Sequence, residues 1–243
     1  MPARAPVGAP RLAAVCTVVI EVDEDGSRLL AVRDEDPERA WDPLGPWWPE
    51  QHPGVIGIRD RRAGGAWLAV DPGAHRLAVL LNRADVLGLP EDQVVSRGSL
   101  ALDSVAGRAP VAPLPMHGFN LLEVDTRGAR VLSWDGSSLR ETPVPPGVHM
   151  IAHDDLDDPG TPRIARWLPV FRAHAHAAAW PEDWVALLAE TAELDPEDDR
   201  AIIRDNRPHG YPTQSLLFCT AAVGADGVAV QDRALPRPGH WTA

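Results

Sequence analysis

The chain has 243 residues and a formal net charge of −12 at pH 7. This excess of negative charge repels nucleic-acid phosphates and anionic lipid head groups, so we expect neither nucleic acid nor a membrane surface as a partner. Every one of the 23 basic residues is arginine, which excludes Schiff-base and P-loop chemistry that depends on lysine.

The amino terminus and the cysteine content indicate a cytoplasmic protein. Residues 1–15 contain three prolines and lack the apolar run of a signal peptide, so we interpret them as a disordered or misannotated leader before a single domain over 16–243. Cys16 and Cys219 are too few for a disulfide framework and predict a reducing compartment. The bias towards Arg, Ala and Pro is typical of a GC-rich bacterial gene.

The first half of the chain predicts β-structure. Apolar runs over 16–22 and 28–34 flank the acidic glycine turn 23–27, which is the pattern of a β-hairpin. The Pro- and Trp-rich segment 41–54 is interpreted as a loop. Short apolar runs separated by glycine turns then predict an antiparallel meander, over residues 55–58, 66–70 and 76–82.

The second half adds helices. Apolar residues over 164–178 recur at helical spacing, and we expect Pro169 to kink or split that helix. A second helix is predicted to start at Pro181, and Asp195-Pro196-Glu197 predicts the cap of a third. The remaining expected elements are a short helix over 96–106 and strands over 118–125, 130–136, 147–153, 215–223 and 228–235.

An ordered series of short motifs resembles one known family. Cys16-Thr17 opens the first predicted strand and Arg33-Asp34-Glu35 closes the second, as in the Cys-Thr start and Asn-Arg-Asp-Glu signature of the NRDE (transport and Golgi organisation) family. The resemblance extends over about residues 16–235 and continues through Trp48, Gly57-Ile58-Arg59-Asp60, Gly64-Gly65-Ala66-Trp67-Leu68, Leu81-Asn82-Arg83, Ser96-Arg97-Gly98, Gly118-Phe119-Asn120-Leu121 and Gly210-Tyr211-Pro212-Thr213-Gln214-Ser215.

The resemblance implies an α+β fold, namely the four-layer αββα sandwich of the N-terminal-nucleophile hydrolases with mostly antiparallel sheets. The family is similar to cysteine acylases that cleave linear amides, in which an N-terminal cysteine is the nucleophile and its own α-amine is the base. Cys16 is then the nucleophile, Arg33 lowers its thiol pKa, Asp34 orients the amine or the substrate nitrogen, and Asn82 donates a hydrogen bond to an oxyanion.

This mechanism needs Cys16 at the amino terminus. A free α-amine titrates near pH ~7.7–8.0 and exchanges a proton with a thiol, whereas an amide nitrogen does not. Removal of residues 1–15, or translation starting at Val15 from a GTG codon, would free Cys16. We favour the second route as a hypothesis, which an intact-mass measurement of protein made from the native gene tests.

Each candidate also has an ordinary structural interpretation. Cys16 could be a buried small hydrophobe, Arg33 and Asp34 a structural ion pair, and Asn82 a turn cap. His174 and His176, two apart on a predicted helix, project in different directions and are interpreted as solvated side chains, so no metal site is predicted.

Two functions follow from the resemblance. The first is binding or trafficking of a small molecule, a lipid or haem at a degenerate site, because several positions depart from the family pattern. The alternative is a cysteine amidohydrolase acting through Cys16. Haem would need an axial ligand, for which the candidates are Cys16, His75, His117 and His153. The departures are Val32, Ala40, Ala66, His153 and Gln214.

Overall fold

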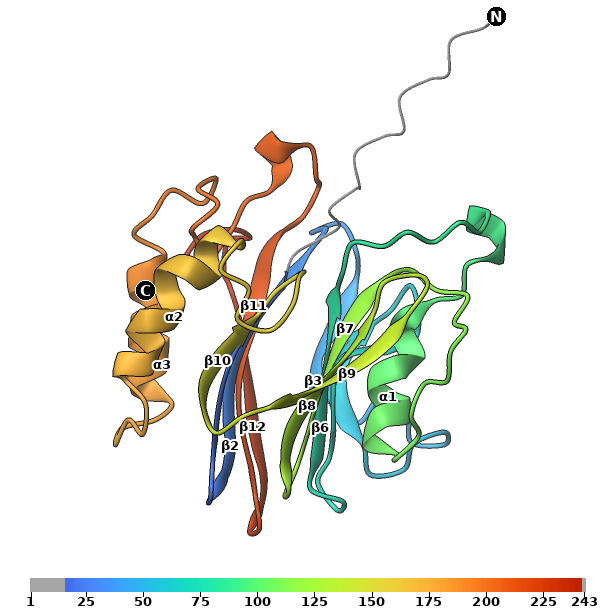
Figure 1. The fold of residues 1–243 in the computed structure, drawn as a ribbon, viewed down its shortest axis with the longest axis horizontal. Helices are drawn as coiled ribbons and strands as arrows, with labels where there is room; N and C mark the ends of the chain where they lie inside the picture. Colours follow the sequence, from blue (N-terminus) through green and yellow to red (C-terminus); the bar gives the residue numbers. More distant parts are fainter. Residues whose placement is uncertain (1–15, 242–243) are drawn as a thin grey trace, which may run out of the picture.

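Two β-sheets lie face to face in the computed structural model, which describes residues 16–241 (Figure 1). The strand pairings within this range are antiparallel and three helices accompany them, so the α+β class is confirmed. The interpretation of residues 1–15 lies outside the described residues. One hydrophobic core fills the space between the sheets. A second core lies between the five-stranded sheet and two helices, and a third lies between the seven-stranded sheet and one helix.

The five-stranded sheet contains the predicted amino-terminal and carboxy-terminal hairpins, which are confirmed. Along its first strand, alternate residues face the other sheet or the helices, because successive side chains of a strand point to opposite faces. Val18 and Ile20 lie in the core between the sheets, whereas Val19 packs under the helices. In spatial order the strands are β10 (Gly147–Ile151), β1 (Thr17–Asp23), β2 (Gly26–Glu35), β11 (Gln214–Gly224) and β12 (Gly227–Ala234).

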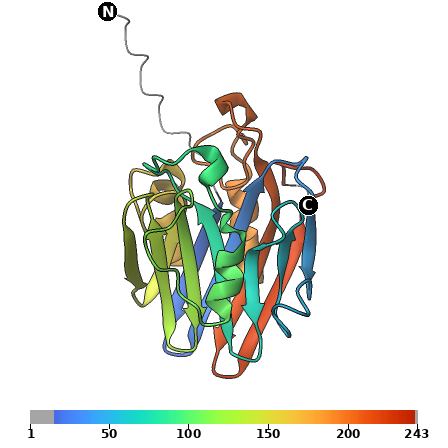
Figure 2. The ribbon, with the colours of Figure 1, turned by 90° about the vertical axis from the view of Figure 1, so that its right-hand side faces the viewer.

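The seven-stranded sheet is a meander in which each strand pairs with the next along the chain. Its central strands confirm the prediction, and Figure 2 shows α1 (Leu100–Val105) lying against the outward face of this sheet. The strands in order are β3 (Trp41–Gly45), β4 (Ile56–Asp60), β5 (Ala66–Asp71), β6 (Arg76–Asn82), β7 (Phe119–Asp125), β8 (Gly128–Trp134) and β9 (Leu139–Val144).

Both edge strands of this sheet were missed by the sequence pattern. The segment interpreted as a loop begins with β3, whose buried Asp42 accepts hydrogen bonds from Arg59 Nε and Arg61 Nε at 2.6 Å each. At the other edge, β9 is largely exposed and has no apolar alternation. Each strand contains a proline, Pro43 or Pro143, which an edge strand tolerates because one of its sides has no hydrogen-bonding partner strand.

Two helices cover the outer face of the five-stranded sheet (Figure 1). Helix α2 (Pro162–Ala173) is not split at Pro169, because its buried apolar stripe holds both halves against the sheet. It ends earlier than predicted, so His176 lies outside it. Helix α3 (Glu182–Thr191) begins at the predicted place.

The prediction of a third helix, capped by Asp195-Pro196-Glu197, is wrong. The Asp195 side chain accepts the backbone N–H of Glu197 at 2.9 Å, and the Asp198 side chain accepts that of Arg200 at 2.8 Å. Such local bonds offer the backbone an alternative to helix, and the segment forms turns instead. No helix within residues 16–241 has both the length and the apolar character needed to cross a bilayer.

Candidate functional site

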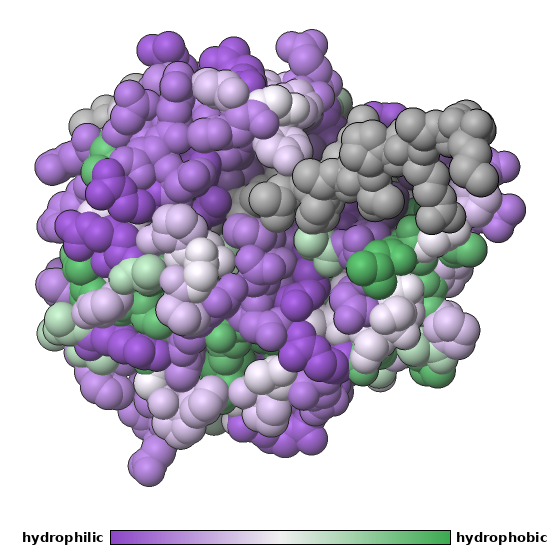
Figure 3. Space-filling view, turned by 45° about the horizontal axis from the view of Figure 1, so that its top comes forward, coloured by the Kyte–Doolittle hydropathy of each residue, from purple (hydrophilic) through white to green (hydrophobic). Residues whose placement is uncertain are grey.

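A cavity of about 660 Å³ is lined by residues of both sheets. It lies at the end of the molecule where β1 begins, which is the upper end in Figure 1. All four residues predicted for the site, Cys16, Arg33, Asp34 and Asn82, line it. The face turned forward in Figure 3, which includes this end, is mostly hydrophilic with smaller hydrophobic patches. The β1–β2 hairpin of one sheet and β6 of the other therefore bring these four residues together.

Cys16 lies immediately before β1 and is buried, with 5% of its surface exposed. Its thiol donates a hydrogen bond to the carbonyl oxygen of Asp34, with Sγ and O 3.7 Å apart. Burial raises the pKa of this thiol to about 12, since the thiolate would lose its hydration. The charge of Arg33 lowers the thiol pKa, as predicted, but this effect is smaller than that of burial, so Cys16 is a protonated thiol at neutral pH.

Arg33 provides a buried positive charge on the Cys16 side of the sheet. The strand register pairs Thr17 with Val32, which makes Cys16 and Arg33 neighbours on adjacent strands. The guanidinium lies 3.6 Å from a carboxylate oxygen of Glu35, and its side chain is 3% exposed. Its Nη1 atom has no hydrogen-bond partner among residues 16–241. Buried guanidinium groups normally satisfy their donors, so this nitrogen is available to donate to a ligand oxygen.

The Asp34 carboxylate faces the opposite side of the sheet, under the helices. Ser215 Oγ donates to Asp34 Oδ1 at 2.6 Å, and no ion pair joins Asp34 to the neighbouring arginine of its own strand among the described residues. Burial raises the pKa of Asp34 to about 6, and the positive charges of Arg163 and Arg204 oppose that rise. We infer that Asp34 lines the cavity with its backbone. Its side chain belongs to a buried polar network on the other face of the sheet.

Asn82 is the last residue of β6 and lines the opposite wall of the cavity from the five-stranded sheet. Its place at the end of a strand agrees with the prediction from sequence. The assigned role, donation to an oxyanion, stays a prediction.

Arg97 is a further cavity residue to which the sequence reasoning assigned no role. It donates from Nη1 to the carbonyl oxygen of Gly118 at 2.5 Å, and burial lowers the pKa of its guanidinium. Its position depends on close contact of two loops, because a Cβ added to Gly65 would lie 2.0 Å from the carbonyl oxygen of Gly98. The Gly-Gly and Ser-Arg-Gly motifs, read together, were the available signal for this contact.

The cavity also has a paired charge and an apolar part. Arg39 Nε donates to Asp60 Oδ2 at 2.7 Å, so this pair is internally satisfied. Trp67 and Leu80 supply apolar surface. The site therefore combines apolar surface with two arginines, Arg33 and Arg97, that form no hydrogen-bonded carboxylate pair in the described part of the chain.

Of the five positions that depart from the family pattern, Ala66 lines the cavity, whereas Val32, Ala40, His153 and Gln214 do not. The side chains of His153 and Gln214 have partners elsewhere. His153 Nε2 is 3.1 Å from Asp154 Oδ2. The Gln214 amide donates to Asp205 and to the carbonyl oxygen of Pro238 at 3.1 and 3.3 Å. Both side chains have partners of their own, and neither reaches the thiol.

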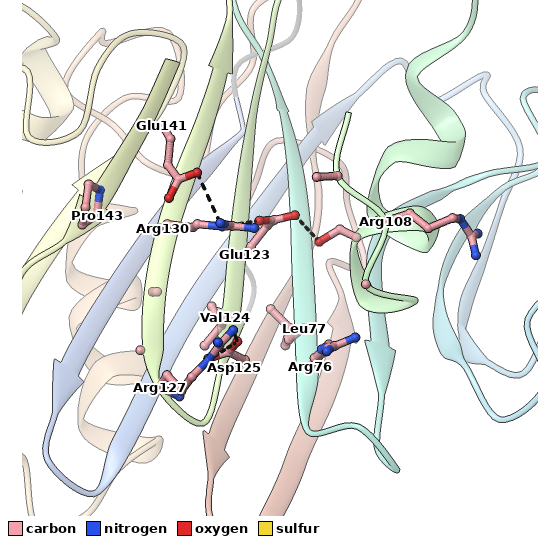
Figure 4. Close-up of a pocket in the computed structure, with 15 residues that line it drawn as sticks. Arg76, Leu77, Arg108, Glu123, Val124, Asp125, Arg127, Arg130, Glu141 and Pro143 are labelled. Carbon is pink, nitrogen blue, oxygen red and sulfur yellow. Dashed lines mark hydrogen bonds and ion pairs between the residues drawn. The ribbon is translucent and has the colours of Figure 1, made fainter. Parts of the chain in front are cut away.

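A second cavity, of about 490 Å³, lies between α1 and the outer face of the seven-stranded sheet (Figure 4). Several of its charged side chains form ion pairs. Arg130 contacts Glu123 at 2.7 Å and Glu141 at 3.2 Å, and Arg127 contacts Asp125 at 2.6 Å. Arg76 donates to the carbonyl oxygen of Val105 at 3.4 Å. Among the described residues, no buried side-chain donor of this cavity is left without a partner, whereas Arg33 Nη1 is, which makes the Cys16 cavity the better candidate for ligand binding.

Comparison with known proteins gives one family. The family described as "Transport and Golgi organisation 2" matches residues 16–208, which confirms the resemblance found in the sequence. No curated protein matches the chain. The matched range contains the four predicted site residues as well as Arg97.

Proposed function

Because the chain belongs to the Transport and Golgi organisation 2 family, we propose that it binds a small organic anion in the Cys16 cavity and acts in binding or trafficking rather than in hydrolysis. A ligand with a carboxylate or phosphate head and an apolar tail complements the arginines and the apolar surface of this cavity. The ligand's head group would lie beside Arg33.

The buried Nη1 atom of Arg33 is the observation that carries this proposal. A guanidinium donor without a partner costs free energy when it is removed from water, and an anionic oxygen would recover that cost. The protonated thiol of Cys16 adds a neutral neighbour, because its pKa is raised to about 12. Both features suit binding of an anion better than nucleophilic attack.

We propose further that the scaffold is the αββα sandwich of the N-terminal-nucleophile hydrolases. Two facing sheets with helices on both outer faces support this assignment (Figures 1 and 2). So does the start of β1 directly after Cys16. The fold alone does not settle the activity, since one scaffold hosts many functions.

Haem fits the described residues poorly. Of the candidate axial ligands, Cys16 and His117 line the cavity, whereas His75 and His153 do not. Both ring nitrogens of His117 already face carboxylates, at 3.0 and 3.3 Å. Cys16 would have to lose its proton against its raised pKa. These residues therefore do not favour haem binding, and a Soret titration of the purified protein should show no specific haem complex.

The binding proposal predicts a charge-selective site that depends on Arg33. Octanoate should bind measurably more tightly than octylamine in isothermal titration. Substitution Arg33→Gln should raise the octanoate Kd about 10-fold or more, because a hydrogen bond to a charged group contributes about 1.5–3 kcal/mol.

Arg62→Gln is the matched control for this titration, because Arg62 lines the same cavity but is exposed. The control removes the same charge and should leave the Kd nearly unchanged. Equal affinity of the native chain and a folded Arg33→Gln variant would contradict the proposal, as would tighter binding of octylamine.

A cysteine amidohydrolase is the second candidate, and the convergence of Cys16, Arg33 and Asn82 on one cavity favours it. That reaction requires removal of residues 1–15, so that Cys16 carries a free α-amine. The α-amine then takes the thiol proton, the sulfur attacks the amide carbon, and Asn82 donates to the resulting oxyanion. This chemistry requires a reactive thiolate, so the reactivity of Cys16 separates the two functions.

A further inference from the structure

Three potential metal ligands meet at the far end of β1 from Cys16. Glu21, Asp23 and His176 each direct one ligand atom into a cluster whose atoms lie within 4.8 Å of one another. Glu21 and Asp23 are two residues apart on one strand, so their side chains share the face that the helices cover. The rise of a strand places this cluster about 20 Å from Cys16, which makes it a separate site.

The distances in the cluster suit a shared cation better than direct hydrogen bonds. His176 Nδ1 lies 3.3 Å from Glu21 Oε1 and 3.7 Å from Asp23 Oδ2. Ordinary N–H···O bonds are about 2.7–3.2 Å long. In a tetrahedral zinc site with bonds of about 2.0–2.1 Å, neighbouring ligand atoms are about 3.4 Å apart. Small side-chain shifts would therefore bring these atoms to coordination distance.

A buried carboxylate oxygen provides an independent indication of a ligand. Glu21 is 1% exposed, and its Oε2 atom has no hydrogen-bond partner among residues 16–241. The other oxygen accepts the backbone N–H of His176 at 2.7 Å, which ties the two residues together. An ionised carboxylate that is buried and half satisfied is costly unless a cation compensates its charge.

The arginine opposite Glu21 in the β1–β2 register, Arg28, does not supply that cation. Its guanidinium is positioned over the ring of Trp180, 5.8 Å from the centroid. No ion pair between Arg28 and Glu21 is found in the described range 16–241. The negative charge of Glu21 is therefore open to compensation by a metal.

The backbone conformation of His176 is also unusual. His176 has φ of +55°, a left-handed conformation that costs non-glycine residues about 1–3 kcal/mol and is often retained at functional positions. The two carboxylate oxygens of Asp23 have different neighbours. Oδ1 accepts the backbone N–H groups of Asp25 and Gly26 at the hairpin turn, which leaves Oδ2 towards the histidine.

We propose that Glu21, Asp23 and His176 bind one divalent transition-metal ion, with Zn²⁺ as the best match. One imidazole nitrogen and two carboxylate oxygens are ordinary zinc ligands, whereas Mg²⁺ and Ca²⁺ prefer sets made of oxygen alone. The three protein ligands leave a fourth position for water. The ion links β1 to the connection between α2 and α3, so it fastens the helical layer to the sheet.

Zinc titration of the full chain after chelator treatment tests the proposal. We expect a single Zn²⁺ per chain by isothermal titration, tighter binding than for Mg²⁺, and a melting temperature that rises with added Zn²⁺ because the metal binds only the folded state. His176→Gln and Asp23→Asn should each weaken Zn²⁺ binding about 10-fold or more. Asp23→Asn keeps the oxygen that accepts the turn N–H groups, so the hairpin should be retained.

His174→Gln is the matched control. His174 lies two residues away and its Nδ1 faces the carbonyl oxygen of Val170, outside the cluster. This variant should bind Zn²⁺ like the native chain. The proposal is overturned if native protein and His176→Gln bind Zn²⁺ equally, or if His174→Gln weakens binding as much as His176→Gln does.

Discussion

Replacement of Trp184 by alanine is expected to lower the free energy of unfolding by about 3–5 kcal/mol, the range for large aromatic side chains removed from a core. Trp184 is fully buried, and its ring meets that of Phe171 edge to face at 5.4 Å between centroids. Its indole N–H also donates to the carbonyl oxygen of His174 at 3.3 Å. Urea unfolding followed by circular dichroism measures the loss.

Trp47→Ala is the control for this substitution. Trp47 is only partly buried, and its ring lies 4.9 Å from the guanidinium of the partly exposed Arg59 in a cation–π contact. We expect a loss of about 1 kcal/mol, since such a contact contributes about 0.5–1 kcal/mol at exposed sites. Similar losses in the two variants would contradict the assignment of Trp184 to the core that joins α2 and α3 to the sheet.

Asp34→Asn is expected to change the pH dependence of stability. The pKa of Asp34 is raised from 3.8 to about 6, chiefly because burial disfavours its charged form. A carboxyl group whose pKa is higher in the folded state stabilises the fold below its unfolded pKa, and this contribution is lost as the pH rises through the folded pKa. The native chain should thus lose about 3 kcal/mol from this group between about pH 4 and pH 8.

The asparagine variant lacks this ionisation. The difference in unfolding free energy, variant minus native, should therefore increase by about 3 kcal/mol across the same pH range. The amide that replaces the carboxyl group would still offer an oxygen to the Ser215 hydroxyl. Asp25→Asn, at the exposed β1–β2 turn, is the control and should show a nearly constant difference. A constant difference for Asp34→Asn as well would refute the burial of a titrating carboxyl group.

Local patterns in the sequence were sufficient for most of the fold. The β1–β2 hairpin followed from apolar runs on both sides of an acidic glycine turn, and its register places Cys16 beside Arg33. The meander followed in the same way from its glycine turns. The edge strands β3 and β9 were not predicted, because neither has an apolar alternation. Pairing with β4 and the ion pairs of the buried Asp42 hold β3 in the sheet, and pairing with β8 holds β9.

Four residues of the candidate site could be named from the sequence, whereas the role of Arg97 and the chemistry of the site could not. The motifs named Cys16, Arg33, Asp34 and Asn82, and all four line one cavity. Sequence could not give the balance between desolvation and charge at the thiol, because burial depends on the whole packed structure. The sequence also did not show on which face of the five-stranded sheet the Asp34 carboxylate lies.

The histidine cluster shows a different limit of sequence reasoning. Helical periodicity placed His174 and His176 on one helix, which excluded a shared metal. The helix ends at Ala173, and the left-handed turn at His176 brings its ring to Glu21, 155 residues away in sequence. Contacts of that range depend on tertiary structure and leave no local pattern.

The alkylation rate of Cys16, with and without octanoate, tests the binding account most directly. A Cys219→Ala background leaves Cys16 as the single thiol, and iodoacetamide labelling is followed by intact mass. With a thiol pKa of about 12, labelling near pH 7.5 should be about 100-fold or more slower than that of a free cysteine. Octanoate should slow it further in the native cavity and not in Arg33→Gln. Fast labelling at neutral pH, or octanoate binding that leaves the rate unchanged, would contradict the account.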